Sequence, residues 1–271
     1  MSIINPNNIV VFDLDETLGY FYELSIFWNM LNDYFKTYLS EEDFIKVLEL
    51  YPEFLRPNII DILKYVITKK KNKKCSKIMI YTNNQGEKKW TQMICKFFDK
   101  KLKTKTFDQI IAAFKVNGEK VELCRSSHDK SVSDLIKCTK IPENTRICFL
   151  DDQFHSLMEH DNVYYINLKP YEHSISFEEM ALRYYNKFNN NFNKIDNDDF
   201  VDFAVKYMKS NYKYNSKSDN EQQIDNIISK KILTHLKEFF KDTLPIKKTK
   251  KHKNKSKNKS KNKTKKLNIT I

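Results

Sequence analysis

Three short apolar runs, each followed by polar residues able to contact a phosphate or a metal, most constrain the fold of this chain. The runs are Ile9–Phe12, Ile78–Tyr81 and Ile147–Leu150, and they are followed by Asp13–Thr17, Thr82–Asn84 and Asp151–Asp152. Short continuous runs rich in β-branched and aromatic residues are typical of buried strands in a parallel sheet. Open α/β sheets bind ligands beyond the carboxyl ends of their strands. The sequence therefore predicts an α/β fold with a functional crevice where these three strands end.

Strands and helices are predicted to alternate over residues 9–172. Helical segments are expected from Pro57, at 88–98 and at 131–139, with a further strand at 163–166. This alternation favours a Rossmann-like parallel sheet with helices on both faces. We take residues 1–172 as one domain.

Two insertions are predicted within that domain. An aromatic stretch with helical spacing predicts a small helical cap over about residues 19–55, in which Phe27, Trp28 and Tyr34 are assigned to the core rather than to a substrate entrance. An Asn117-Gly118 pair between strand-like runs predicts a β-hairpin over about residues 112–124, because both positions of a type I′ turn need positive φ.

The last hundred residues are predicted to form a helical extension and a tail. Two helices within 177–208 and an amphipathic helix from Ile224 to Phe240 predict an extension over 173–245. Residues 246–271 are predicted to be a disordered lysine-rich tail. Residues 247–266 hold twelve lysines and no acid against a net charge of +13, so the remainder is nearly neutral. Such a tail contacts nucleic acid non-specifically or directs a protein to the nucleus; the alternative is a solubilising tail.

Composition excludes several classes of protein. Only three glycines occur, so neither a dinucleotide-binding G-x-G-x-x-G loop nor a Walker A loop is present. No run of about 18 apolar residues and no signal-peptide pattern is found, which predicts a soluble intracellular protein, cytoplasmic or nuclear, without a membrane partner. The five cysteines form no C-x-x-C pair and are odd in number, so we expect structural roles, with neither a zinc site nor a complete disulfide framework.

The carboxylates at the strand ends fit the hydrolysis of a phosphate monoester. This reaction needs a nucleophile, a proton donor for the leaving group and cations that offset phosphate charge. Asp13 is predicted to attack phosphorus and form an aspartyl-phosphate, while Asp15 protonates the leaving oxygen and then activates water. Mg²⁺ prefers hard oxygen ligands, and we expect Asp13 and Asp151 to hold it.

The predicted phosphate-binding residues are Thr82, Asn83 and Lys130, with Thr17 and Asp152 in support. Several alternatives stay open. Asp13 and Asp15 could belong to a solvated turn, Thr82 could cap the following helix, and Asp152 is the likelier of the acidic pair to be an N-cap. Arg125 could face the site or the surface. His128 and His155 are assigned no role.

These motifs resemble the haloacid-dehalogenase-like phosphohydrolase superfamily. Its signature of D-x-D-x-T, a strand-end Ser or Thr, a Lys and an acidic pair is similar to Asp13–Thr17, Thr82, Lys130 and Asp151–Asp152 in this order. The resemblance implies Mg²⁺ held by Asp13, the backbone carbonyl of Asp15, and Asp151. It covers about residues 9–172.

Within the superfamily, these motifs look closest to those of the phosphatases of the RNA polymerase II C-terminal domain and their nuclear-interacting-factor-like relatives. This implies an enzyme acting on phosphoserine or phosphothreonine, so the expected partner is a phosphorylated macromolecule, protein before nucleic acid. Thr82-Asn83-Asn84 stands where that branch usually has Thr-Ala-Ser, and Thr82–Gly86 looks partly like polynucleotide 3′-phosphatases. A nucleic-acid 3′-end phosphatase is therefore the alternative activity, and a catalytically idle nucleic-acid or protein binding module is the alternative of another class.

Overall fold

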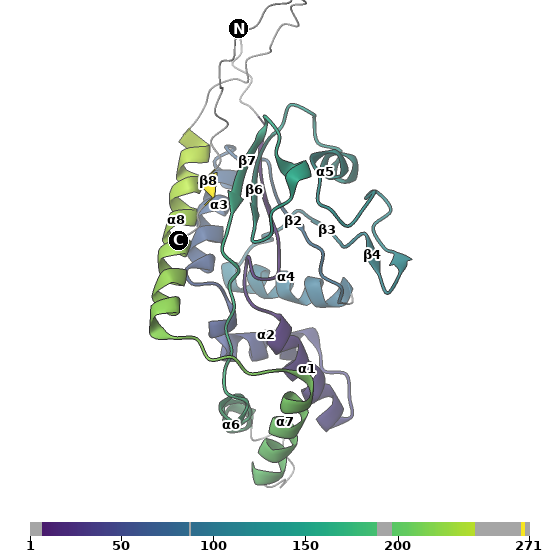
Figure 1. The fold of residues 1–271 in the computed structure, drawn as a ribbon, viewed down its shortest axis with the longest axis vertical. Coiled ribbons are helices and arrows are strands. Elements are labelled where there is room, and N and C mark those ends of the chain that lie inside the picture. Colours follow the sequence, from purple (N-terminus) through teal and green to yellow (C-terminus); the bar gives the residue numbers. More distant parts are fainter. Residues whose placement is uncertain (1–6, 87, 189–196, 242–266, 269–271) are drawn as a thin grey trace, which may run out of the picture.

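A parallel β-sheet forms the centre of the protein (Figure 1). The computed structural model describes residues 7–86, 88–188, 197–241 and 267–268. The strand order is β3-β2-β1-β6-β7-β8, with every neighbouring pair parallel. The strands are β1 (Asn8–Phe12), β2 (Lys77–Tyr81), β3 (Gln109–Ile111), β6 (Arg146–Asp151), β7 (Val163–Asn167) and β8 (Leu267–Asn268). The three apolar runs are thus β1, β2 and β6.

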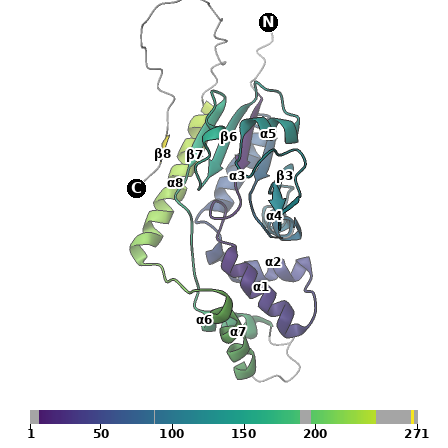
Figure 2. The same cartoon turned by 45° about the vertical axis from the view of Figure 1, so that its right-hand side comes forward.

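Helices cover both faces of the sheet because successive strand residues point in opposite directions. Val10 and Phe12 belong to a core shared with α3 (Ile59–Lys71), α4 (Lys88–Leu102) and α8 (Asp219–Lys241). Ile9 and Val11 belong to a second core, shared with α5 (Val132–Thr139). Figure 2 shows these two layers around the strands. The predicted α/β fold, Rossmann-like and with helices on both faces, is confirmed.

Two helices lie between β1 and α3, where the sequence predicts a helical cap. They are α1 (Tyr22–Phe35) and α2 (Glu41–Leu50), followed by the 3-10 turn η1 (Pro52–Phe54). Ser40 begins α2 with a capping box, in which its hydroxyl accepts from the N–H of Asp43. Phe27 and Trp28 are buried, and Trp28 packs edge-on against Phe44 with ring centroids 5.4 Å apart. Their predicted core position is confirmed.

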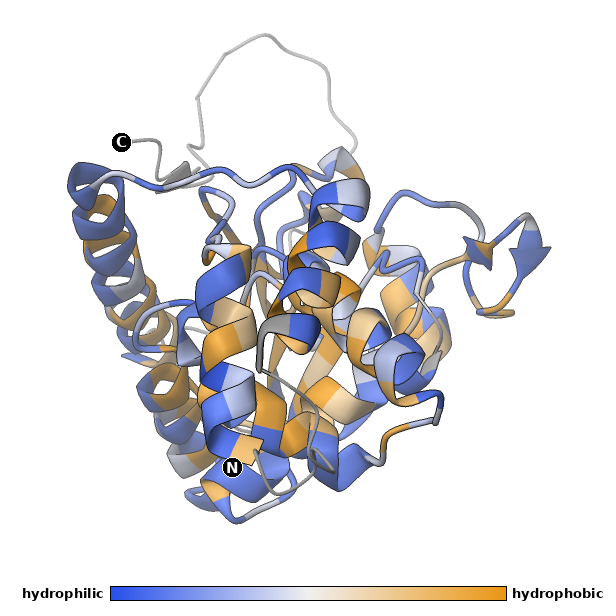
Figure 3. Ribbon diagram, turned by 90° about the horizontal axis from the view of Figure 1, so that it is seen from below, coloured by the Kyte–Doolittle hydropathy of each residue, from blue (hydrophilic) through white to orange (hydrophobic). Residues whose placement is uncertain are grey.

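The helices after residue 173 pack on the rest of the protein. α6 (Phe177–Phe188) and α7 (Asn197–Asn211) lie against α2 and α1, and α8 lies along α3 and β7. The hydroxyl of Tyr51 donates to the carbonyl of Met180 at 2.6 Å, and the rings of Tyr34 and Phe200 are 4.9 Å apart. In Figure 3 the helix at the left, α8, carries hydrophilic residues on its outer side and hydrophobic residues on its inner side. The apolar sides of α6, α7 and α8 complete the core that includes α1 and α2.

The predicted hairpin forms around Asn117-Gly118. Both residues have positive φ, 50° and 84°, as the type I′ turn requires. The strands β4 (Lys115–Val116) and β5 (Glu119–Lys120) are shorter than the predicted 112–124 hairpin. One reason is that the carbonyl of Ala112 accepts a hydrogen bond from the guanidinium of Arg125 instead of a strand partner.

The predicted disordered tail, residues 246–271, lies outside the described residues except for Leu267–Asn268. These two residues pair in parallel with the end of β7, which differs from the disorder predicted for them. The physical reason is that an edge strand offers free backbone groups to a further strand. Among the described helices, none combines the length and hydropathy that a membrane span needs.

A buried carboxyl at the start of α1 makes stability depend on pH. Glu23 is fully buried, and its Oε1 accepts from the N–H of Ile175 at 3.3 Å. Burial raises the pKa of Glu23 from 4.5 to about 7, against the lowering effect of hydrogen bonds from Ser174, Ile175 and Tyr212. Because the folded-state pKa is the higher one, the neutral form is favoured, and its stabilisation is lost as pH rises from about 4.5 through about 7.

We therefore expect Glu23→Gln to remove part of the pH dependence of folding. Relative to this variant, the wild type should lose roughly 3 kcal/mol of unfolding free energy between pH 4.5 and pH 8. Urea denaturation of both proteins across this range measures the difference. Parallel curves for the two proteins would contradict the assignment to Glu23.

Candidate functional site

The strand order reverses between β1 and β6, and this point fixes the place of the candidate site. From β1 the chain builds β2 and β3 outward on one side and then β6 and β7 on the other. Phe12 pairs with Leu150, so Asp13 and Asp151 end neighbouring strands. The N–H of Asp13 donates to the carbonyl of Leu150 at 2.8 Å. A parallel sheet opens into a crevice at such a reversal.

A cavity of about 140 Å³ lies at these strand ends. It is lined by Asp13, Asp15, Glu16, Thr82, Asn83, Asn84, Lys130, Asp151, Asp152 and Gln153. The structure therefore brings together every predicted site residue except Thr17, which is buried and hydrogen-bonds the lining residue Asp152. The alternative of a solvated turn is excluded for Asp13, because its side chain is buried.

Lys130 connects the first and last of these strand ends. Its ammonium contacts Oδ1 of Asp13 and donates to Oδ2 of Asp151 at 2.6 Å. All three side chains are buried, with Lys130 only 2% exposed. A buried ammonium stays charged only when it is paired in this way.

The charges in this cluster shift one another's pKa values. Burial lowers the pKa of Lys130, but Asp13 and Asp151 raise it by more, so its net pKa is raised. Burial raises the pKa of Asp151, yet Lys130 and His155 together bring it below the usual range. The pKa of Asp13 is raised by burial and by Asp151 and Asp15, which outweigh Lys130. The cluster thus holds more carboxylate charge than one lysine offsets.

Asp15 is positioned by a residue that the sequence analysis left without a role. The side-chain amide of Asn84 donates to Oδ2 of Asp15 at 2.7 Å, and Oδ1 of Asn84 accepts from the N–H of Gly86 at 2.8 Å. Burial raises the pKa of Asp15, while the Asn84 hydrogen bond lowers it. The sequence shows Asn84 within the departure from the Thr-Ala-Ser pattern after Thr82, but it gives no sign of a contact with Asp15.

Neither Thr82 nor Asp152 has the helix-capping role that the sequence left open. Thr82 Oγ1 accepts from the N–H of Asn84 at 3.0 Å, and α4 starts only at Lys88, so Thr82 does not cap it. Asp152 accepts from the Thr17 hydroxyl at 3.1 Å and is not a helix N-cap. Thr17 and Asp152 therefore connect the segment after β1 to the segment after β6.

Asn83 lies on the cavity wall, where its Oδ1 is buried without a hydrogen-bond partner in the described structure. His155, which the sequence analysis assigned no role, places Nε2 3.5 Å from Oδ2 of Asp151. Asp151 therefore lies close to two nitrogens, Nε2 of His155 and the ammonium of Lys130.

Two buried arginines hold the loops of the site. Arg125 donates to the carbonyls of Thr82 at 3.0 Å, Ala112 at 2.9 Å and His128 at 2.9 Å. Arg56 donates to the carbonyl of Thr17 at 2.7 Å and also to those of Glu16 and Lys169. Arg125 therefore faces neither solvent nor the cavity. Both arginines fix backbone segments that carry site residues.

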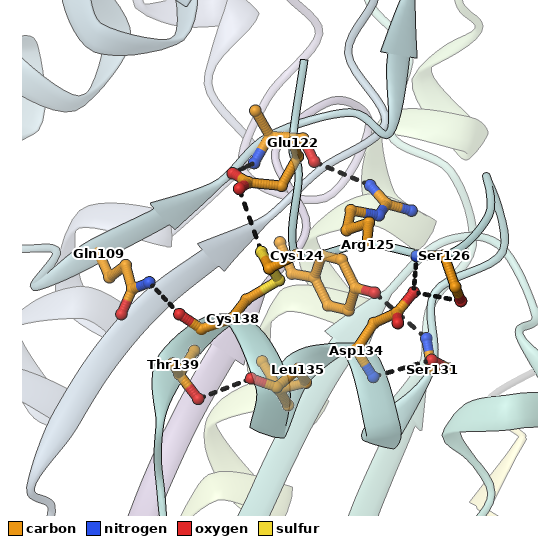
Figure 4. Close-up of a disulfide and its surroundings, with 12 residues drawn as sticks. Gln109, Glu122, Cys124, Arg125, Ser126, Ser131, Asp134, Leu135, Cys138 and Thr139 are labelled. Carbon is orange, nitrogen blue, oxygen red and sulfur yellow. Dashed lines mark hydrogen bonds between the residues drawn. A yellow bond between two sulfur atoms is a disulfide. The ribbon is translucent and has the colours of Figure 1, made fainter. Parts of the chain in front are cut away.

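A disulfide between Cys124 and Cys138 closes the segment that carries Arg125 and Lys130 (Figure 4). The sequence analysis found no complete disulfide framework, and this single bridge is a correction at two of the five cysteines. Its residues lie fourteen positions apart and meet because the chain after the hairpin returns along α5. The other three cysteines are buried thiols, as expected of structural residues.

Three carboxylates of the cavity have the chemistry of a divalent-cation site. Asp13, Asp151 and Asp152 each offer an oxygen, and these atoms lie within 4.8 Å of one another. The raised pKa values of Asp13 and Asp152 follow from burial and from neighbouring acids, which a bound cation would offset. Mg²⁺ takes ligands of this kind. The donor set therefore fits a hard cation.

Comparison of the chain with protein-family models, with curated proteins and with solved structures finds no match in any of the three. The residues of the site alone therefore indicate its chemistry. Their arrangement joins two carboxylates on one short segment, a second strand-end carboxylate, a buried ammonium and a hydroxyl.

Removing the disulfide should lower stability, since it closes a loop in the unfolded chain. A loop of this length corresponds to about 3 kcal/mol of unfolding free energy. We expect reductant to shift chemical denaturation of the wild type by about this amount. The Cys124→Ser variant should start from the lower stability and show no further shift with reductant; an equal shift in both proteins would contradict the bridge.

Proposed function

We propose that this protein is a Mg²⁺-dependent phosphomonoester hydrolase of the haloacid-dehalogenase-like kind. The observation that carries the proposal is the meeting of Asp13, Asp151 and Lys130 at the reversal between β1 and β6. Asp15, Thr82 and Asn83 line the same cavity. A nucleophile, a proton donor, phosphate ligands and a cation-binding carboxylate set are thus within one small volume.

Asp13 is the nucleophile in this mechanism. Lys130 holds its Oδ1, and Oδ2 attacks phosphorus while the bond from phosphorus to the leaving oxygen breaks. The product is an aspartyl-phosphate on Asp13. The ammonium of Lys130 offsets negative charge beside the phosphoryl group in both steps.

Asp15 carries the proton in both halves of the reaction. Its raised pKa favours a protonated carboxyl that donates to the leaving oxygen. The resulting carboxylate then takes a proton from water, whose oxygen attacks phosphorus and releases Asp13. The Asn84 amide fixes one oxygen of Asp15 during both transfers.

The remaining residues bind the phosphoryl group and the cation. The Thr82 hydroxyl and the Asn83 amide are assigned to phosphoryl oxygens. Asp13, the carbonyl of Asp15, and Asp151 are assigned to Mg²⁺, with Asp152 nearby. Bound there, Mg²⁺ supplies a positive charge that stabilises the phosphate as it reacts.

We propose a phosphorylated macromolecule as substrate, with phosphoserine or phosphothreonine in a protein before a nucleic-acid end. The cap helix α1 lines an open groove beside the cavity. An open site suits a side chain that projects from a larger molecule.

The nucleophile assignment predicts that Asp13→Asn abolishes phosphate release from a generic aryl phosphate. The amide of this variant is not a nucleophile, while its size is nearly unchanged. Release by the wild type should require Mg²⁺ and stop on addition of a chelator. Full activity of Asp13→Asn would disprove the mechanism, and no release by the wild type on any phosphate ester would favour a binding module.

The proton-transfer assignment predicts a leaving-group effect for Asp15→Asn. A general acid contributes about 10²–10⁴-fold to a rate, and most where the leaving group is basic. We expect this variant to lose more activity on an alkyl phosphate than on a nitrophenyl phosphate. Rapid-mixing measurement of the first turnover separates this step from hydrolysis of the intermediate; equal losses on both esters would exclude Asp15 as the acid.

A further inference from the structure

A groove of about 810 Å³ opens beside the catalytic cavity. The two share Asp15, Glu16 and Asn84, so the groove starts at the proposed reaction centre. It then follows α1 from Tyr22 to Asp33, with α4 among its lining elements. The proposed hydrolysis uses only the first end of this groove.

The length of the groove favours a polymer. Tyr22 and Asp33 lie eleven positions apart, which is about 16 Å along a helix. An extended polypeptide covers about 3.3 Å per residue, so roughly five residues would span this distance.

The lining offers aromatic rings and amides to such a chain. Tyr22 is 58% exposed, and Tyr20 and Trp90 also line the groove. Aromatic faces contact apolar side chains without requiring charge. Asn29 and Gln85 each carry both a donor and an acceptor, which matches the alternating N–H and C=O groups of a peptide backbone.

The charge of the groove distinguishes a peptide from a nucleic acid. Of the described residues that line it, Lys89 alone is cationic, whereas Asp15, Glu16 and Asp33 are acidic. A nucleic-acid strand of the same length would bring further phosphates, which bind where Lys and Arg neutralise them. Asp33, at the far end, is exposed, and its charge adds to burial in raising the pKa of Tyr207. This end suits a positive side chain.

We propose that this groove binds the polypeptide that continues from the phosphorylated residue, and that Asp33 selects a lysine or arginine at least five residues away, because the roughly 16 Å along α1 begin only at Tyr22, beyond the reaction centre. The inference rests on the proposed function, because it places the phosphorylated residue at Asp13. Asp33 is a specificity-determining residue here, far from the reacting atoms. Its substitution therefore leaves hydrolysis of a small aryl phosphate unchanged.

The test compares phosphoserine peptides that carry Arg or Glu at successive positions from the fifth residue outward, on either side of the phosphoserine. For the wild type, kcat/KM should be about fivefold higher for an Arg peptide than for its Glu counterpart, the size expected of one exposed ion pair. Asp33→Lys should reverse this preference, with aryl phosphate turnover unchanged. Asp61→Lys, at an exposed acid on α3 that does not line the groove, is the matched control and should keep the wild-type preference.

Binding of the same peptides without phosphate, measured by fluorescence anisotropy, separates the two proposals. If the wild type releases no phosphate from any ester but still prefers the Arg peptide through Asp33, the proposed function fails and the groove assignment stands. Equal kcat/KM for Arg and Glu peptides in the wild type would overturn the groove assignment while aryl phosphatase activity persists. Faster turnover of a 3′-phosphorylated oligonucleotide than of every peptide would also overturn it.

Discussion

The buried contact of Lys130 with Asp13 and Asp151 is the interaction on which the candidate site depends. It joins the ends of β1 and β6 to the start of α5, across 117 residues of sequence. Removing one partner of a buried ion pair leaves an uncompensated charge and costs about 3–5 kcal/mol, so the cluster is stable only as a set. These charges make the cluster costly to bury. They also determine its chemistry, because several carboxylates around one ammonium attract a further cation.

The rest of the protein keeps this set in place. Parallel pairing of β1 with β6 brings the two aspartates side by side, and apolar residues of these strands are buried on both faces of the sheet. Arg56 and Arg125 then bind carbonyls of the loops that follow β1 and β2. Backbone carbonyls that would otherwise be buried without donors are thus paired, and the loops are held at the cavity.

Local signals in the sequence predicted the parts of this arrangement that depend on neighbouring residues. The apolar runs mark β1, β2 and β6 to within a residue, and Asn117-Gly118 marks the turn between β4 and β5. Contacts between distant segments left no such signal. The bridge from Cys124 to Cys138 and the amide of Asn84 on Asp15 both depend on how loops return to the sheet. The sequence left the position of Arg125 open, because the residues around it do not distinguish a guanidinium that binds buried carbonyls from one that lies in water.

The C-terminal helices pack on the cap helices and contribute to the groove beside the site. The local sequence pattern does not predict these contacts. α6 and α7 pack on α1 and α2, and Tyr207 of α7 reaches the groove beside Asp33. The wall of the groove is therefore built by segments that are far apart in sequence. Because α1 is held by this packing, the distance from the strand ends to Asp33 is fixed by a helix and not by a loop. A fixed distance is what a groove needs if it is to select a side chain several residues from the phosphate.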